Sequence, residues 1–241
     1  MALQKTGDLA GAADAYQHAV DLSPADVEAR NSLASALVST RRADEGIAQF
    51  EKILAADPAN APVRVNIGSA YMQKGDLDKA IEQFRAAIER DPKLASAHYD
   101  LGLALKNKDD IEAAKTELRR AIELDPDMAE AHFTLGIAYW QTGGFEEAAG
   151  EMQAAIALRP DYGAAYFMLG TALKQKGDLA GAESALRAAI RLSPDDPGPY
   201  NTLGQLLRQK GDLAGSKAAF AQGEQVKRAK EDELKGLLQK K

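Results

Sequence analysis

The sequence has no cysteine, one tryptophan and three histidines in 241 residues. Without cysteine there are no disulfides and no thiolate chemistry, although such a chain fits a reducing and an oxidising compartment equally well. No apolar run approaches the length of a membrane span, and the start MALQKTGD is no signal peptide. We therefore expect no direct membrane insertion. The default expectation is a cytoplasmic chain, unless it is a fragment of a longer protein.

The sequence also lacks an excess of positive charge. Its formal net charge is −6, which a phosphate backbone would repel, so we expect no nucleic-acid partner. Aromatic residues make up only 6% of the chain, and it is rich in alanine, leucine, glutamate, lysine and glutamine. These side chains lose little entropy in helices, so the composition predicts an all-α fold.

What the sequence does have is repetition. The hexapeptide GDLAGA starts at Gly7 and again at Gly177, and the variant GDLAGS starts at Gly211. Gly177 and Gly211 are 34 residues apart, and Gly7 and Gly177 are separated by five times that number. A fixed period of this size indicates a stack of one supersecondary unit.

This period divides the chain into a partial repeat, six full repeats and a C-terminal capping extension of the last helix, all within a single solenoid over residues 1–241. The partial repeat is 1–26 and the extension is 231–241. The full repeats are 27–60, 61–94, 95–128, 129–162, 163–196 and 197–230. Below, a position is the place of a residue within its full repeat, counted from 1 to 34.

Each repeat contains the signals of two helices and a hinge. Proline, which cannot continue a helix, stands near the end of every unit except the last, which has Arg228 there. The closing prolines are Pro24, Pro58, Pro92, Pro126, Pro160 and Pro194. In the hexapeptide, glycine can adopt the left-handed conformation that ends the first helix, and the following aspartate can cap the second. We therefore predict two antiparallel helices in each repeat.

The resulting pattern resembles the tetratricopeptide repeat family, whose signature W-x2-L-G-x2-Y…A-x3-F…P has counterparts in every full repeat. In one repeat these counterparts are His132, Leu135, Gly136, Tyr139, Ala148, Met152 and Pro160. The resemblance covers residues 1–230. It implies a right-handed superhelical solenoid of helix-turn-helix repeats, with a concave groove that contacts partner proteins.

The repeat 27–60 departs from this pattern. It has Arg41 and Arg42 at the hinge and Gly46 within its second helix. Because glycine in a helix interior costs about 1 kcal/mol relative to alanine, we predict that this is the least stable full repeat.

Helical periodicity separates two faces of the first helix in each repeat. Positions 4, 7, 8 and 11 pack within the repeat, whereas positions 5, 9, 12 and 13, with 2 and 6 at the margin, lie on the opposite face. The resemblance places this opposite face in the groove. The predicted peptide-binding residues are Val65, Ser69, Met72, Gln73, Tyr99, Leu103, Lys106, Asn107, Phe133, Ile137, Trp140, Gln141, Phe167, Met168, Thr171, Lys174 and Gln175.

Several of these residues are aromatic or aliphatic, although the fold does not require apolar side chains there. Such surfaces accept apolar side chains, and the interleaved amides and lysines can hold a peptide backbone or carboxylate. An alternative for Phe133 and Phe167 is sideways packing against the neighbouring first helix. Trp140 lies later in its helix and is harder to explain in that way.

No catalytic or metal-binding constellation stands out, so we expect no enzyme, no cofactor and no metal. The run GDLAGSK at residues 211–217 has three residues between its glycines where a phosphate-binding loop has four. His98 and His132 hold equivalent positions in adjacent repeats, about 10 Å apart, which is too far for a shared zinc ion. They are better explained as fillers of the aromatic slot at position 4.

The leading hypothesis is therefore a non-catalytic scaffold for protein–protein interaction that holds a partner peptide or helix in an apolar concave groove. The alternative is a structural or oligomerising arm of a larger protein or assembly. Residues 1–6 supply only part of a first helix, and Leu234, Leu237 and Leu238 form a short apolar stripe at the other end. These two ends suggest weak end-to-end self-association.

Overall fold

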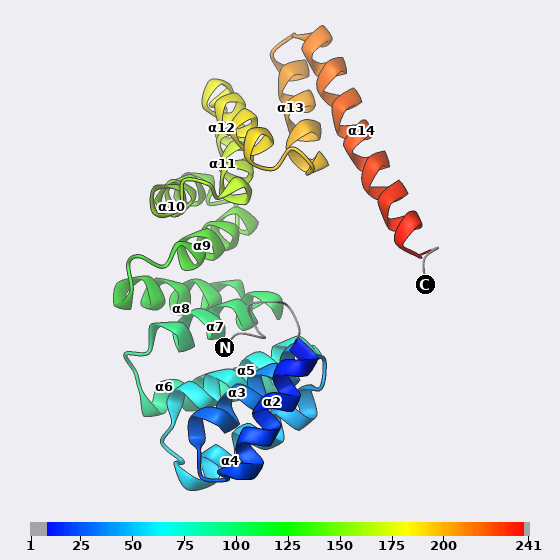
Figure 1. Ribbon diagram of the computed structural model, residues 1–241. Coiled ribbons are helices and arrows are strands. Elements are labelled where there is room, and N and C mark those ends of the chain that lie inside the picture. Colours follow the sequence, from blue (N-terminus) through cyan, green and yellow to red (C-terminus); the bar gives the residue numbers. More distant parts are fainter. Residues whose placement is uncertain (1–8, 239–241) are drawn as a thin grey trace. The chain divides into compact units, whose positions relative to one another are not determined.

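The computed structural model describes residues 9–238, and all of its regular elements in that range are α-helices (Figure 1). The partial repeat contributes α2(Leu9–Leu22). The first helices of the full repeats are α3(Val27–Ser39), α5(Ala61–Lys74), α7(Ala95–Asn107), α9(Ala129–Gln141), α11(Gly163–Lys176) and α13(Pro197–Gln209). The second helices are α4(Ala43–Ala56), α6(Leu77–Arg90), α8(Ile111–Leu124), α10(Phe145–Leu158), α12(Leu179–Leu192) and α14(Leu213–Leu238). The predicted all-α solenoid of helix pairs is thereby confirmed.

The chain forms two compact units, Met1–Pro126 and Asp127–Lys241, called unit 1 and unit 2 below. Their boundary lies close to the end of the repeat 95–128, so unit 1 contains α2 to α8 and unit 2 contains α9 to α14. The single solenoid over residues 1–241 and its repeat boundaries remain a prediction. The predicted partial first helix at residues 1–6 lies outside the described residues, as do residues 239–241 of the extension.

The hinge at position 15 is left-handed in all six full repeats. Glycine fills it four times, with φ between 79° and 86° at Gly75, Gly143, Gly177 and Gly211. The other two residues there are Arg41 (φ 64°) and Asp109 (φ 67°), both in unit 1. A side chain with a Cβ is strained in this region by about 1 kcal/mol or more. Unit 1 therefore carries two strained hinges, and unit 2 carries none.

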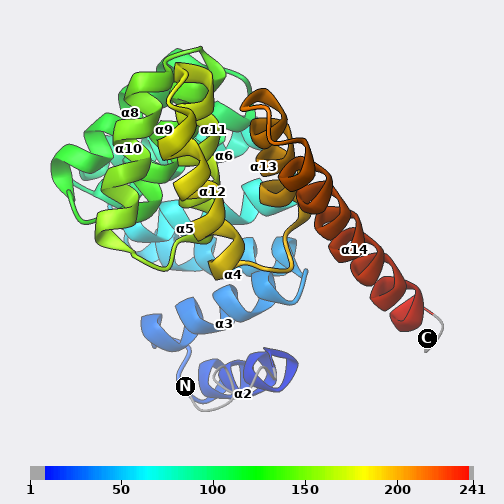
Figure 2. The same cartoon turned by 90° about the horizontal axis from the view of Figure 1, so that it is seen from above.

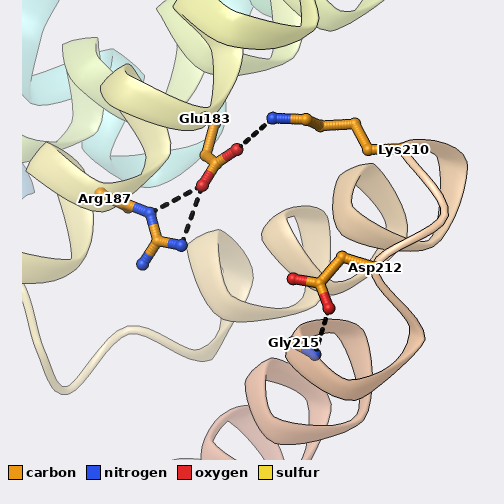
Figure 3. A network of polar contacts seen from close by, with 5 residues as sticks. All are labelled: Glu183, Arg187, Lys210, Asp212 and Gly215. Atoms are coloured by element: carbon orange, nitrogen blue, oxygen red, sulfur yellow. Dashed lines mark hydrogen bonds and ion pairs between the residues drawn. The ribbon is translucent and has the colours of Figure 1, made fainter.

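Aspartate after the hinge caps the second helix, as predicted. The Asp178 carboxylate accepts from the backbone N–H of Gly181 at 2.9 Å. Figure 3 shows the equivalent bond one repeat later, in which Asp212 accepts from Gly215 at 2.8 Å. In the repeat 27–60 Arg42 takes the cap position and makes no side-chain cap bond. Losing such a cap costs about 1 kcal/mol, which adds to the strain at Arg41.

Small residues at positions 8 and 20 let the two helices of a pair approach closely. A Cβ at Gly170 would lie 2.7 Å from Leu186 Cγ, so the leucine fills the space that glycine leaves. In the repeat 27–60 the two residue types are exchanged, with Ala34 at position 8 and Gly46 at position 20. A Cβ at Gly46 would lie 2.7 Å from the Ala34 carbonyl oxygen. Gly46 thus compensates for Ala34 rather than merely weakening its helix.

In several repeats the side chain at position 4 contacts the carbonyl of the closing proline that precedes the repeat. Tyr200 Oη donates to the Pro194 carbonyl at 3.1 Å, Arg64 Nη2 donates to Pro58 at 3.1 Å, and His98 Nε2 lies 3.2 Å from the Pro92 oxygen. His98 Nδ1 also lies 2.7 Å from a Glu117 oxygen of the second helix. This confirms the structural role expected for the position 4 slot.

A row of ion pairs links neighbouring repeats. At position 14, lysine reaches an acid on the second helix of the preceding repeat. The pairs are Lys74 with Asp44, Lys108 with Asp78, Lys176 with Glu146 and Lys210 with Glu183. In the last pair, the Lys210 ammonium and then the Arg187 guanidinium hold the pKa of Glu183 below its usual value (Figure 3). Exposed pairs of this kind contribute about 0 to 1 kcal/mol each.

The last helix is longer than the others, with 26 residues in α14 against 13 in α13. Both views show α14 running on past α13 (Figures 1 and 2). Leu213 at its start is 69% exposed, unlike its half-buried equivalents Leu77 and Leu179. Leu213 is exposed because no helix follows α14 within the described residues to cover it.

Candidate partner-binding face

Within each unit, neighbouring first helices contact one another directly. The contacts are between α3 and α5 and between α5 and α7 in unit 1, and between α9 and α11 and between α11 and α13 in unit 2. Among the described helices of either unit, neighbouring second helices make no such contact. The side formed by the first helices is therefore the tighter side of each stack. We call its surface, made by positions 2, 5, 6, 9, 12 and 13, the inner face.

In unit 1 the predicted groove residues form a mixed surface on α5 and α7. Val65 is only 8% exposed and forms part of its floor. Met72 packs at the edge of the hydrophobic core cluster around Phe84 and remains half-buried. Tyr99, Leu103 and Lys106 are also half-buried, whereas Ser69, Gln73 and Asn107 are exposed.

The inner face of unit 1 is hollowed between α3 and α5. A depression of about 190 Å³ is lined by Ser35, Val38, Ser39, Phe50, Asn66 and Ser69. Across it, Asn66 Nδ2 donates to Asn31 Oδ1 at 3.2 Å. Position 6 of one repeat therefore lies beside position 5 of the repeat before it, inside the groove. The prediction had placed position 6 only at the margin.

In unit 2 the predicted residues form a more apolar surface on α9 and α11. Five half-buried apolar side chains there pack against the core cluster around Met152 and Leu186. These are Phe133, Ile137, Trp140, Phe167 and Met168. Thr171 is half-buried, and Gln141 and Gln175 are exposed. Lys174 Nζ donates to Gln205 Oε1 on α13 at 2.8 Å.

Both phenylalanines of this surface make sideways contacts. The Phe133 ring lies 4.7 Å from the Tyr162 ring, between centroids, and a Cβ at Gly198 would lie 3.2 Å from the Phe167 ring. Tyr162 is the N-cap of α11 and Gly198 lies at the start of α13, so each ring packs against the start of the next first helix, as in the alternative. Each ring keeps part of its surface open, so packing and partner contact are compatible.

Trp140 is anchored at the hinge of its own repeat. Its ring meets Phe145, at the start of α10, edge-on at 6.5 Å between centroids. Its Nε1–H is buried and has no hydrogen-bond partner among the described residues. An unpaired buried donor is uncommon and costs free energy. Trp140 therefore packs against its own repeat and also forms part of the inner face. The sequence predicted only its place on that face.

One residue of the inner face was missed by sequence reasoning. Asp100 stands at position 6 of α7 and is half-buried. Burial raises the pKa of Asp100 to about 6 from its ordinary value of 3.8. The available signal was that the other full repeats have neutral residues at this position, namely Ser32, Asn66, Thr134, Met168 and Thr202.

The described residues contain no group of three or more histidines, aspartates or glutamates that could hold a metal ion. His132 Nδ1 lies 2.7 Å from Glu151 of its own repeat, as His98 does from Glu117. In the same part of the chain, no helix combines the length and hydropathy needed to cross a bilayer.

Comparison with known proteins identifies the family. The sequence matches the Cilia and flagella-associated protein 70 C-terminal domain family over residues 1–236. No curated protein matches the chain. Among solved structures, MamA is 26% identical, with 69% of this chain and 97% of that chain covered and a TM-score of 0.66.

Two further solved structures share the fold. YrrB, described as a TPR protein with an unusual peptide-binding site, is 20% identical over 73% of this chain and 91% of that chain, with a TM-score of 0.66. The Cut9–Hcn1 tetramer of the APC/C matches over 93% of this chain and 44% of that chain, with 17% identity and a TM-score of 0.74. The chain therefore belongs to the tetratricopeptide repeat family of the Cilia and flagella-associated protein 70 C-terminal domain.

Proposed function

We propose that this protein is a non-catalytic interaction scaffold whose inner face binds a peptide or helix of a partner protein. The observation that carries the proposal is the half-open apolar surface on α9 and α11, at positions where pair packing within a repeat requires no apolar residue. The description of YrrB as a TPR protein with a peptide-binding site supports the same kind of function.

The expected affinity is moderate. Three or four partner side chains buried on this surface contribute roughly 1.5 to 3 kcal/mol each, and association costs several kcal/mol. The balance corresponds to micromolar binding, in which groove shape and a few polar contacts supply specificity.

The test begins with the full chain as bait for a phage-displayed library of random 12-residue peptides. Binding of the enriched peptides is then measured by fluorescence anisotropy. We expect Ile137→Ser or Leu103→Ser to weaken binding roughly 10- to 100-fold, the loss of one apolar anchor. The matched control is Leu158→Ser on α10, where the leucine is 39% exposed and lies on a second helix.

Circular dichroism of each variant establishes that the helices remain folded. Equal binding by wild type and both inner-face variants contradicts the proposal. Binding that falls only in Leu158→Ser contradicts it as well, because the partner then uses the outer side.

A second candidate is a structural or oligomerising arm. The specific observation for it is the apolar side of α14, where Leu234 and Leu237 are each 58% exposed. If the ends associate, the mass measured by sedimentation rises with concentration, and Leu234→Ser with Leu237→Ser removes the rise. A mass that stays monomeric at all concentrations eliminates this candidate.

A further inference from the structure

Asp100 is an acid in the groove of unit 1 that the fold leaves without a partner. On α7 it shares a helical stripe with Leu103 and Asn107, three and seven residues later, so it belongs to the inner face. Among residues 9–238, no hydrogen bond or ion pair reaches its carboxylate. Its half-buried state therefore has no compensating polar contact.

Comparison with Asn66, one repeat earlier, explains why the carboxylate is isolated. Asn66 lines the depression on the inner face and donates to Asn31 at position 5 of the preceding repeat. The residue that corresponds to Asn31 beside Asp100 is Val65, which is 8% exposed. Burial raises the pKa of Asp100, and a valine at the corresponding position offers no hydrogen bond to offset it.

The isolated carboxylate costs the protein stability. At neutral pH Asp100 is ionised, and an ionised group that is partly desolvated and unpaired is unfavourable. The neutral residues at position 6 of the other full repeats indicate that the fold does not need an acid there. A residue that breaks a local rule without a structural gain is a candidate for function.

We propose that Asp100 binds an arginine or lysine side chain of the partner segment, with apolar side chains of the same segment lying on Met72 and Leu103. This inference rests on the proposed function, because it assumes that the inner face is the binding surface. The cation would supply the charge-assisted hydrogen bonds that Val65 cannot. The net charge of −6 also favours the approach of a basic segment.

The test uses the full chain and the phage-displayed library of random 12-residue peptides. Peptides that depend on Leu103 are expected to carry an arginine or lysine. Replacing that residue by glutamine should weaken binding to the wild type roughly 10- to 100-fold and leave binding to Asp100→Asn unchanged. Asp100→Lys should instead select peptides that carry an acid at the same place.

The matched control is Glu89→Gln, a neutralised exposed acid on α6 away from the inner face, which should change affinity less than about twofold. Loss of binding in Asp100→Asn is not a sign of unfolding, because this variant is expected to be more stable than the wild type. Unfolding curves verify that point.

Two results overturn the inference in distinguishable ways. If peptides depend on Leu103 but carry no basic residue and bind Asp100→Asn as tightly as the wild type, Asp100 has no role and the groove function stands. If no enriched peptide depends on any inner-face residue, both the proposed function and the role of Asp100 are wrong.

Discussion

The inner faces of the two units differ although the same helix pair builds both. Unit 1 has a depression lined by serines, Asn66, Val38 and Phe50, an amide pair between Asn31 and Asn66, and the unpaired Asp100. Unit 2 has a mainly apolar surface that includes Trp140 and packs partly on its own core. Pair packing fixes positions 4, 7, 8 and 11 but leaves 5, 6, 9, 12 and 13 free. The difference teaches that the free positions are where one scaffold acquires different surface chemistry.

The two units also differ in the residue at position 15, the hinge between the two helices of a repeat. Unit 2 has glycine at position 15 of every repeat, whereas unit 1 has Arg41 and Asp109 in the left-handed region. Unit 1 therefore combines strained hinges with an isolated carboxylate. We infer that unit 1 is the less stable of the two.

The largest expected effect concerns two residues at position 12, Trp140 of unit 2 and Lys106 of unit 1. Trp140→Ala should destabilise the protein by about 3 kcal/mol, because the ring packs on Phe145 and on the core. Lys106→Ala should change the free energy of unfolding by less than about 0.5 kcal/mol. Urea unfolding followed by circular dichroism measures both. Equal effects of the two substitutions would remove the claimed contrast between the faces.

The next effect is a pH dependence confined to unit 1. Well below pH 3.8 Asp100 is protonated in both the folded and the unfolded chain. As the pH rises to about 6, the unfolded chain ionises first, so the wild type loses stability relative to Asp100→Asn. Above that pH the variant should be more stable by about 3 kcal/mol, at 1.36 kcal/mol per pKa unit.

Unfolding of both proteins at pH 3.5 and pH 7.5 tests this expectation. The gain from Asp100→Asn should be present at the higher pH and nearly absent at the lower. Val65→Asn, which restores the position 5 partner, is the companion variant and should recover part of the gain while keeping the acid. A gain that is the same at both pH values contradicts the assignment to the carboxylate.

A smaller effect comes from the hinges. Arg41→Gly should stabilise the protein by about 1 kcal/mol, because glycine removes the left-handed strain. The control Gly75→Ala places a Cβ at an equivalent hinge with open space around it and should destabilise by a similar amount. Hydrogen exchange should also be fastest in the repeat 27–60 among the full repeats. Faster exchange in another full repeat would show that the strained hinge and missing cap of the repeat 27–60 do not control local stability.

The smallest effect concerns the ion pairs between repeats. Lys108→Ala in unit 1 and Lys176→Ala in unit 2 should each cost less than about 1 kcal/mol, with the cost falling as salt is added. Because the same pair occurs in both units, the two losses should be alike. A large loss in one unit alone would mean that these contacts contribute to the contrast between the units.

The fold could be predicted from the sequence because proline, glycine and small residues recur at fixed positions, each with a local physical reason. The first helices begin at Val27, Ala61, Ala95 and their counterparts, and the hinge glycines are left-handed. Helical periodicity separates two faces of each first helix, and the family resemblance is needed to choose one of them as the candidate face. Which of its side chains are covered could not, because coverage depends on contacts between repeats.

Trp140 and Asp100 illustrate that limit. The contact of Trp140 with Phe145 depends on how the hinge folds back, which no pattern of spacing states. Asp100 has at position 5 of the preceding repeat a valine, Val65, where the equivalent Asn66 has Asn31, and only the structure shows that these two positions meet. A comparison of position 6 across the repeats would nevertheless have marked Asp100 as the single acid.

The most direct test of the binding claim is hydrogen–deuterium exchange of the full chain with and without a peptide selected on it. If the inner face binds the partner, the peptide adds protection in the first helices. A peptide that carries a basic residue should protect α5 and α7 of the wild type. That protection should be lost in Asp100→Asn. Added protection confined to the second helices, or to the end of α14, would contradict the claim that the inner face binds the partner.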